Sequence, residues 1–179
     1  MSDNFNIDEA EDSEDEGLVQ LVGFGVANEH FGVDILMVQE ILRSANVTRV
    51  PNAPEFIEGV LNLRGNIVPV IDLRKRLNLY NKETSEKKCW TLILNIENKV
   101  VGFIVDKVTE VLKIEEARVE MAPEIIVSGL ESQYIEGVCE IAGKLIIILD
   151  FDLVLFNEEQ KLLKEMDDDA LILTENDMI

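Results

Sequence analysis

The 179-residue chain is poor in the residues that most often carry out chemistry. It has one histidine, His30, and two cysteines, Cys89 and Cys139, which stand alone in apolar, strand-like surroundings. Two isolated cysteines are too few for a disulfide framework or a zinc site, so we expect both to be buried thiols. No Walker loop, dinucleotide glycine fingerprint, nucleophile elbow or pair of metal-binding histidines occurs. These absences speak against an enzyme, a metal site and a bound cofactor.

Long apolar runs and basic clusters are also missing. No stretch of about twenty apolar residues could span a bilayer, so direct membrane insertion is not expected. The N-terminus has no basic residue and no apolar segment, which argues against a signal peptide and predicts a cytoplasmic protein. No stripe of lysine and arginine exists that could displace counterions from phosphates, so nucleic acid is not expected as a partner.

Negative charge is abundant but uneven. Of the net charge of −20, residues 1–16 carry −8 and residues 158–179 carry −6, which leaves −6 for the 141 residues between them. We expect residues 1–16 to be a disordered acidic tail. Residues 158–179 are expected to form a helix followed by an acidic tail. The helix is predicted from a cap, an acidic first turn and an apolar face: Asn157, Glu158, Glu159, Leu162, Leu163 and Met166.

The main feature of the remaining chain is an internal repeat. FIEGVLNLRGNIVPVIDLRKRL at residues 56–77 is echoed by YIEGVCEIAGKLIIILDFDLVL at 134–155, an offset of 78. RVPNAPE and RVEMAPE match at an offset of 69, and FGVDILMVQEIL lies over VGFIVDKVTEVL at 70. The later copy contains nine extra residues, IIVSGLESQ, interpreted as a loop. We therefore expect one domain at 17–157 made of two copies, at about 18–80 and 88–157.

Each copy reads as a series of short strands with turn signals between them. Residues 18–26 and 89–96 end at turn candidates, and a second hairpin follows in each copy. Residues 31–42 are ambiguous, because their apolar positions suit either a helical face or an alternating strand. Many short strands favour small barrels, and two copies favour two barrels packed together. The predicted turns are Asn28 with Glu29, Gly65 with Asn66, Asn98 with Lys99, and Gly143 with Lys144.

One hairpin position conflicts with regular pairing. If Gly65 and Asn66 form the loop, Asn62 faces Pro69, which has no N–H to donate to a ladder. We expect irregular pairing there, or an edge position. The second copy has Ile147 at that place and no such conflict.

The two copies disagree most visibly where NLR at residues 62–64 is replaced by EIA at 140–142. A strand through the first copy would put Asn62 and Arg64 on one face. The Arg64 guanidinium could anchor a carboxylate or amide of a partner, since arginine often anchors interfaces. Equally, it could pair inside the molecule with Glu40 or Glu58. Composition alone leaves both readings open.

These segments resemble a known family. VDILMVQEI, RVPNAPEF, FIEGVLNLRGNIVPVIDLRKRL and VVGFIVDKVTEVL are similar to the CheW-type chemotaxis coupling proteins, in which NLRG is the most recognisable signature. The similarity runs from about residue 18 to 157. It implies an all-β fold with short helices, in which two five-stranded SH3-like barrels are related by a pseudo-twofold axis. Residues 31–42 would then be a strand, a short turn and a second strand.

The resemblance also implies a function. Family members are non-catalytic adaptors that join the histidine kinase CheA, whose regulatory domain shares the fold, to the cytoplasmic tips of chemoreceptors. Pseudo-symmetry leaves open contacts with other coupling proteins in array rings. The kinase would bind an apolar barrel surface that includes Ile35. The receptor tip, a helical hairpin, would bind the groove between the barrels, at positions matching Val38, Glu40, Gly59, Asn62, Arg64 and Val108.

Two alternatives remain beside the adaptor. The first is a sensor that binds a small molecule between the two barrels, because pockets favour such interfaces. The second is an unrecognised enzyme, for which only His30 and scattered carboxylates could serve.

Overall fold

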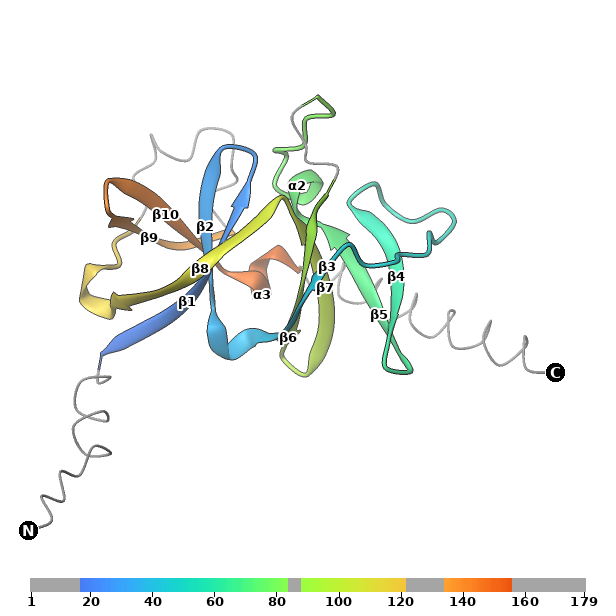
Figure 1. The fold of residues 1–179 in the computed structure, drawn as a ribbon, viewed down its shortest axis with the longest axis horizontal. Helices are drawn as coiled ribbons and strands as arrows, with labels where there is room; N and C mark the ends of the chain where they lie inside the picture. The colour runs from blue at the N-terminus through green and yellow to red at the C-terminus, as the bar shows by residue number, and fades with distance from the viewer. Residues whose placement is uncertain (1–16, 84–87, 122–133, 156–179) are drawn as a thin grey trace, which may run out of the picture.

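The described part of the chain is built almost wholly from β-strands (Figure 1). The computed structural model describes residues 17–83, 88–121 and 134–155. The predicted acidic tail at 1–16 and the predicted C-terminal helix and tail at 158–179 lie outside these residues. Within the described ranges, no helix is long and apolar enough to cross a membrane.

Ten strands form two five-stranded sheets, as the family resemblance implies. The first sheet has the order β8-β1-β2-β10-β9 and the second has the order β3-β6-β7-β5-β4. Helices α2 (Leu73–Arg76) and α3 (Phe151–Val154) and the 3-10 turns η1 (Ile35–Met37) and η2 (Glu116–Arg118) join the strands. The strands are β1 Leu18–Val26, β2 Glu29–Asp34, β3 Val38–Arg43, β4 Ile57–Leu63, β5 Asn66–Asp72, β6 Trp90–Ile96, β7 Lys99–Val105, β8 Lys107–Glu115, β9 Ile135–Ile141 and β10 Lys144–Leu149.

The two sheets do not coincide with the two sequence copies. The β1–β2 hairpin of the first copy lies in the first sheet with β8, β9 and β10 of the second copy. The β6–β7 hairpin of the second copy lies in the second sheet with β3, β4 and β5 of the first. Figure 1 shows this exchange as blue strands beside orange ones. The parallel pair β2–β10 joins the β1–β2 hairpin to strands of the second copy, and the parallel pair β5–β7 joins the β6–β7 hairpin to strands of the first.

Strand registers repeat with two of the offsets seen in the sequence, 70 for the middle block and 78 for the last one. The middle block is a strand, the turn η1 and a second strand, so the helical option for residues 31–42 is wrong. Bulges also recur at equivalent places in β3 and β8 pairing. The equivalent cross-strand pairs are Val38–Leu94 with Val108–Phe24, and Asn62–Ile67 with Glu140–Leu145.

The RVPNAPE and RVEMAPE block is out of step with the structure. A single bridge joins Thr48 to Val60 of β4, and an equivalent bridge joins Glu120 to Val138 of β9. Thr48 and Glu120 are 72 positions apart, whereas the letters match at 69. The second copy is longer before its bridge, because β8 has nine residues where β3 has six. Matching letters at the start of this block are therefore not equivalent positions.

All four hairpin turns lie one residue earlier than predicted from the sequence. Their central residues are Ala27–Asn28, Arg64–Gly65, Glu97–Asn98 and Ala142–Gly143. In the last three turns both central residues have positive φ, with 54° at Arg64 and 87° at Gly65. Glycine and asparagine tolerate this conformation best, and here they take the second central position. Arg64 is thus a turn residue and does not share a strand face with Asn62.

Pro69 interrupts the pairing of β5 with β7, whereas the sequence predicts irregular pairing within the β4–β5 hairpin. Its pairing with Val60 in the β4–β5 hairpin is regular, and the Val60 N–H and C=O are bonded to Thr48 on the far side of β4. Residues facing each other in this kind of antiparallel pair exchange no hydrogen bonds, so the missing Pro69 N–H falls on the β7 side. The β5–β7 ladder accordingly begins at Val70, whereas the equivalent Ile147 pairs with β2.

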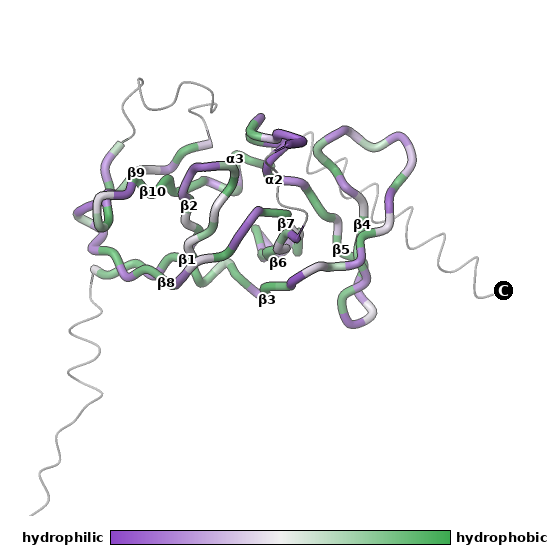
Figure 2. The backbone as a smooth tube through the Cα atoms, turned by 45° about the horizontal axis from the view of Figure 1, so that its top comes forward, coloured by the Kyte–Doolittle hydropathy of each residue, from purple (hydrophilic) through white to green (hydrophobic). Residues whose placement is uncertain are grey.

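Three apolar clusters hold the sheets together. The largest contains residues from both sheets and from α2 and α3, and the two smaller ones each lie within one sheet. Hydrophobic colour runs along the strands of both sheets, while most loops at their ends are hydrophilic (Figure 2). Cys139 is buried in the first sheet, as expected, but Cys89 is only half-buried. Partial burial raises the pKa of the Cys89 thiol, which makes it a poor nucleophile.

The two copies of the FIEGV and YIEGV echo meet at Arg76. Its guanidinium carbon lies 5.2 Å from the Phe56 ring centroid and 4.8 Å from that of Tyr134. Its Nε donates a hydrogen bond to the carbonyl oxygen of Val154 at 3.2 Å. Phe56 and Tyr134 are 78 positions apart, as are Arg76 and Val154. These pairs of equivalent residues therefore lie about the pseudo-twofold axis, with one cation between the two rings.

A buried ionic network ties the exchanged β1–β2 hairpin to α2. Arg74 forms two hydrogen bonds with the Asp72 carboxylate, at 2.9 and 2.8 Å, and one of 3.1 Å with Asp106. The other Asp106 oxygen accepts a hydrogen bond from the Ala27 N–H at 2.7 Å. The hydrogen bond to Asp72 raises the pKa of the Arg74 guanidinium. Three charged groups are thus held together with little contact with water.

Replacement of Arg74 should cost far more stability than replacement of an exposed arginine. Arg74→Met leaves Asp72 and Asp106 buried without their cation, so we expect the free energy of unfolding to fall by about 3 kcal/mol or more. The matched control is Arg64→Met, which removes an exposed ion pair and should cost less than about 1 kcal/mol. Urea denaturation of both variants measures the difference. Equal losses would show that the buried network does not hold the fold together.

Two glycines of β4 and its turn should respond differently to alanine. A Cβ on Gly59, whose φ is +150°, would overlap the Thr48 carbonyl oxygen. A Cβ on Gly65, whose φ is +87°, would meet nothing within 4 Å. We expect Gly59→Ala to cost about 3 kcal/mol or more. Gly65→Ala should cost only about 1 kcal/mol, the strain of its backbone. Thermal unfolding compares the two, and a tolerated Gly59→Ala would contradict the close approach of Thr48 and Arg49.

Candidate functional site

The predicted receptor-binding residues lie on three strands and in one turn. Val38 and Glu40 lie on β3, Gly59 and Asn62 on β4, and Val108 on β8, while Arg64 lies in the β4–β5 turn. Strands β3 and β4 are at opposite edges of the second sheet. An ion pair of 3.4 Å between Arg64 and Glu40 nevertheless connects the β4–β5 turn to β3 at the other edge of this sheet.

Arg64 is mostly available to a partner despite this ion pair. Its side chain is 80% exposed, and that of Glu40 is 28% exposed. An exposed pair of this length contributes little to stability, because water screens it. Glu58, the other predicted partner of Arg64, pairs instead with Lys75 at 2.7 Å. The intramolecular pairing and the interface reading of Arg64 are therefore compatible, since a partner carboxylate could take the guanidinium at small cost.

Asn62 shapes the turn that carries Arg64. Its Oδ1 accepts a hydrogen bond from the Gly65 N–H at 2.9 Å, which closes the loop over the left-handed Arg64. The equivalent residue of the second copy is Glu140. Asn62 is thus a positioning residue for Arg64, a role that the sequence could indicate only if the turn had been placed correctly.

Gly59 contributes through its backbone and offers no side chain to a partner. It is buried beneath the bridge at Thr48, where no Cβ fits. The equivalent Gly137 is also close to its bridge, since a Cβ would lie 3.2 Å from the Glu120 carbonyl oxygen. Any substitution at Gly59 would displace the β4 edge and with it the Arg64 turn.

Val38 and Val108 occupy equivalent places in the two sheets. Each is half-buried and packs against the largest apolar cluster. Val38 faces Leu94 of β6 and Val108 faces Phe24 of β1. Each valine therefore lies where an exchanged hairpin pairs with a strand of the other copy. The two valines are thus equivalent under the pseudo-twofold symmetry and lie on different strands.

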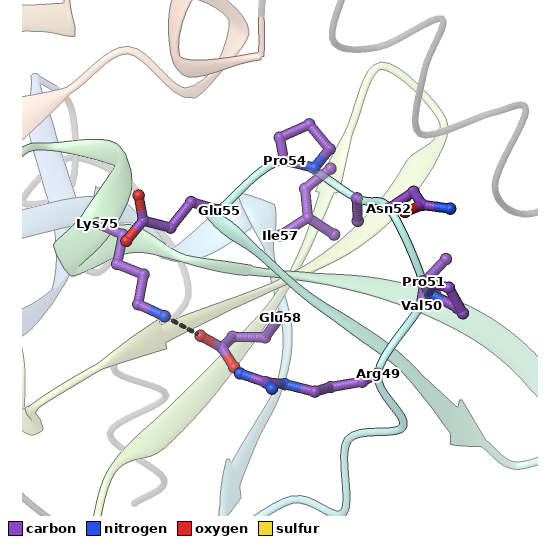
Figure 3. A pocket seen from close by; sticks show the side chains of 10 residues that line it. Arg49, Val50, Pro51, Asn52, Pro54, Glu55, Ile57, Glu58 and Lys75 are labelled. Carbon is purple, nitrogen blue, oxygen red and sulfur yellow. Dashed lines mark hydrogen bonds and ion pairs between the residues drawn. The ribbon is translucent and has the colours of Figure 1, made fainter.

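Two surface hollows lie on the second sheet and its loops. The smaller one, of about 300 Å³, is lined by Gln39, Glu40, Leu63, Arg64 and Asn66, so it contains two predicted receptor-binding residues. The larger one, of about 470 Å³, lies under the loop at residues 49–55 (Figure 3). There Lys75 reaches Glu58, and Arg49 points toward the same carboxylate. Neither hollow lies between the two sheets, where the ligand-sensing alternative would place its molecule.

Ile35, the predicted kinase-binding residue, lies in η1. It is half-buried against the largest cluster, as is Met37. Between them Leu36 is 89% exposed, held in this position by the hydrogen bond from its N–H to the Asp34 Oδ1 at 2.9 Å. Leu36 was not singled out from the sequence, because neither the helical nor the strand pattern of residues 31–42 includes it.

No catalytic arrangement accompanies the predicted binding residues in the described parts of the chain. His30 lies in β2 between Gly25 of β1 and Ile146 of β10, neither of which offers a nucleophile. Within the described ranges, no group of three or more histidine, cysteine, aspartate or glutamate side chains is placed to hold a metal ion.

Comparison with known proteins identifies the family. The model of the CheW-like domain matches residues 20–159. The chemotaxis protein CheW of Klebsiella aerogenes is 40% identical over 139 residues, which cover 78% of this chain and 82% of that protein. The Treponema pallidum CheW is 35% identical over 147 residues, with coverage of 80% and 86%.

A solved structure agrees with this match. The scaffolding protein TtCheW of Thermoanaerobacter tengcongensis superposes with a TM-score of 0.71 at 36% identity, covering 79% of this chain and 90% of that one. The fold described above is therefore that of a CheW protein. On sequence and on structure, this chain belongs to the CheW-like family of chemotaxis proteins.

Proposed function

We propose that this chain is a non-catalytic adaptor of bacterial chemotaxis that joins chemoreceptor tips to the regulatory domain of the histidine kinase CheA. Its match to the CheW-like family over nearly all of the described chain carries this proposal. The protein would act in the cytoplasm, at the chemoreceptor array that its partners anchor to the membrane. Residues 17–157 would form one coupling domain containing both barrels.

The receptor tip would bind through the Arg64 hairpin, which we define as β4, β5 and the turn between them. The hairpin presents an exposed guanidinium beside a hollow that is also lined by Glu40. Val38 and Val108 add half-buried apolar surface on β3 and β8. Gly59 and Asn62 would act by fixing the backbone on which Arg64 sits.

The kinase would bind elsewhere, at the apolar turn η1. Ile35 and the exposed Leu36 give this turn an apolar character that contrasts with the charged Arg64 hairpin. Two chemically different surfaces on one molecule are what a bridging adaptor requires. The pseudo-symmetric barrels would also allow contacts with other coupling proteins in a ring. The ligand-sensing alternative gains no support from the hollows or from the relatives.

Charge reversal at Arg64 should separate receptor binding from kinase binding. We expect Arg64→Glu to weaken binding of a receptor hairpin fragment by about 30-fold, equivalent to about 2 kcal/mol, because an interface anchor then repels its partner. Kinase affinity and melting temperature should stay close to wild type. The matched control is Lys144→Glu, which reverses a charge at the equivalent hairpin of the other barrel.

Calorimetric titration of each variant with each partner checks this expectation. Equal losses for receptor and kinase, together with a lower melting temperature, would make Arg64 a structural residue. A further test of the adaptor itself is co-sedimentation of kinase with receptor fragments. Kinase should sediment with receptors only when this protein is added, and sedimentation without it would contradict the proposal.

A further inference from the structure

The larger of the two hollows combines apolar and charged walls (Figure 3). We define the loop hollow as this space of about 470 Å³ and the residues that line it. Its lining comes from the loop at residues 49–55, from the beginning of β4 and from α2. Val50, Pro51 and Pro54 are among the apolar lining residues, and Arg49, Glu58 and Lys75 are among the charged ones.

Arg49 is the cation of the loop hollow that has no carboxylate of its own. The Lys75 Nζ already lies 2.7 Å from the Glu58 carboxylate. The exposed Arg49 side chain points toward the same carboxylate, but it makes no hydrogen bond or ion pair with any residue that the structure describes. The Arg49 guanidinium therefore keeps its donors for a carboxylate from elsewhere.

The described chain ends beside the loop hollow. The last described residue is Leu155, and the carbonyl oxygen of Val154 accepts a hydrogen bond of 3.2 Å from the Arg76 Nε. Arg76 directly follows Lys75 in α2, and its guanidinium carbon lies 5.2 Å from the ring of Phe56, which directly follows the loop at 49–55. The next residues of the chain therefore start next to two of the elements that line the loop hollow.

The remaining C-terminal segment carries the complementary chemistry in its sequence. Residues 156–179 contain eight carboxylates and two lysines, a net charge of −6. The helix that the sequence predicts there would carry Leu162, Leu163 and Met166 on one face together with Glu159, because these positions are three or four residues apart. The helix would need a length of only about 16 Å to reach Met166 from Leu155.

We propose that the C-terminal segment docks in the loop hollow of its own chain. Its apolar face would cover Pro51 and Pro54, and a carboxylate of the predicted helix would bind Arg49. The segment would then hold the loop at 49–55 against β4, the strand that carries Gly59. This inference goes beyond the proposed adaptor function, since it assigns an internal partner to a surface that the adaptor function does not use.

Tethering favours the chain's own segment over a separate molecule. A segment joined to its site by a short linker is present there at an effective concentration on the order of millimolar. A second copy of the chain would have to reach that concentration in solution to displace it. The acidic charge of the segment also complements the open guanidinium of Arg49, which a basic or purely apolar segment would not do.

Disulfide trapping tests this contact in the full-length chain. Pro51→Cys and Lys164→Cys place one thiol on the loop and one beside the apolar face of the segment, and Cys89→Ser removes the half-buried thiol. A disulfide requires two Cα atoms within about 7 Å of each other. Under mild oxidation we expect the intramolecular disulfide to form at least about tenfold faster than in the same chain with Leu162→Asp and Leu163→Asp.

Non-reducing electrophoresis and mass spectrometry distinguish the outcomes. A faster intramolecular disulfide in the chain with the intact apolar face supports the proposal, and equal rates in the two chains overturn it. Disulfide-linked dimers in place of the intramolecular product would assign the loop hollow to a second copy and would also overturn it. Because neither kinase nor receptor is needed, failure here leaves the adaptor function standing.

A charge cycle gives an independent measurement without cysteines. Arg49→Gln should lower the melting temperature by about 2 °C at low salt, because the guanidinium loses its carboxylate. This loss should vanish in a chain that already carries Glu158→Gln, Glu159→Gln and Glu165→Gln, since both changes break the same contact. Salt of about 0.5 M should also reduce the loss, because it screens the charges.

The matched control neutralises three carboxylates at the other end of the chain. In a chain with Glu14→Gln, Asp15→Asn and Glu16→Gln, Arg49→Gln should lower the melting temperature as much as it does in the wild-type chain. A loss that is equal in all three backgrounds would show that Arg49 does not bind the C-terminal segment, and it would overturn the proposal.

Discussion

The clamp of Arg74 between Asp72 and Asp106 is the contact on which the exchanged architecture depends. Asp72 belongs to β5 of the second sheet, while the far oxygen of Asp106 receives the Ala27 N–H from the first sheet. The Arg74 guanidinium thus fixes the β1–β2 hairpin of the first sheet relative to α2, which follows β5 of the second sheet. A buried ionic network is expensive to desolvate and brings little net stability, but it tolerates few alternative arrangements. Its contribution here is to specify how the two barrels meet.

Much of the architecture could be predicted because it depends on local periodicity and on the repeat. The bounds of β1 were predicted correctly, and the offset of 78 reproduces the register of both second hairpins. The turns were displaced by one residue because glycine and asparagine mark a turn without stating which central position they take. The Arg74 clamp was missed since residues 74 and 106 are distant in sequence. Because the two copies are similar, the sequence does not show whether a hairpin pairs with the strands of its own copy or with those of the other.

The predicted site fared differently at each position, for physical reasons. Arg64 is exposed and also pairs with Glu40, so the structure is compatible with both readings that the sequence left open. Gly59 and Asn62 turn out to support the backbone, roles that depend on a bridge and a turn whose positions the sequence did not fix. The pseudo-twofold symmetry determines the overall architecture. The receptor-binding surface that we propose lies where the two copies differ. The Arg64 hairpin follows this rule.

The exchange of hairpins also sets an order for biosynthesis. The second sheet needs the chain only as far as β7, so it can assemble once residue 105 has left the ribosome. The first sheet contains β1 and β2 from the beginning of the chain, but it must wait for β10, which ends at Leu149. During that interval the apolar faces of β1 and β2 have no final partner. A nascent chain stalled between these two points would therefore expose the edge of β2 that β10 covers in the finished chain.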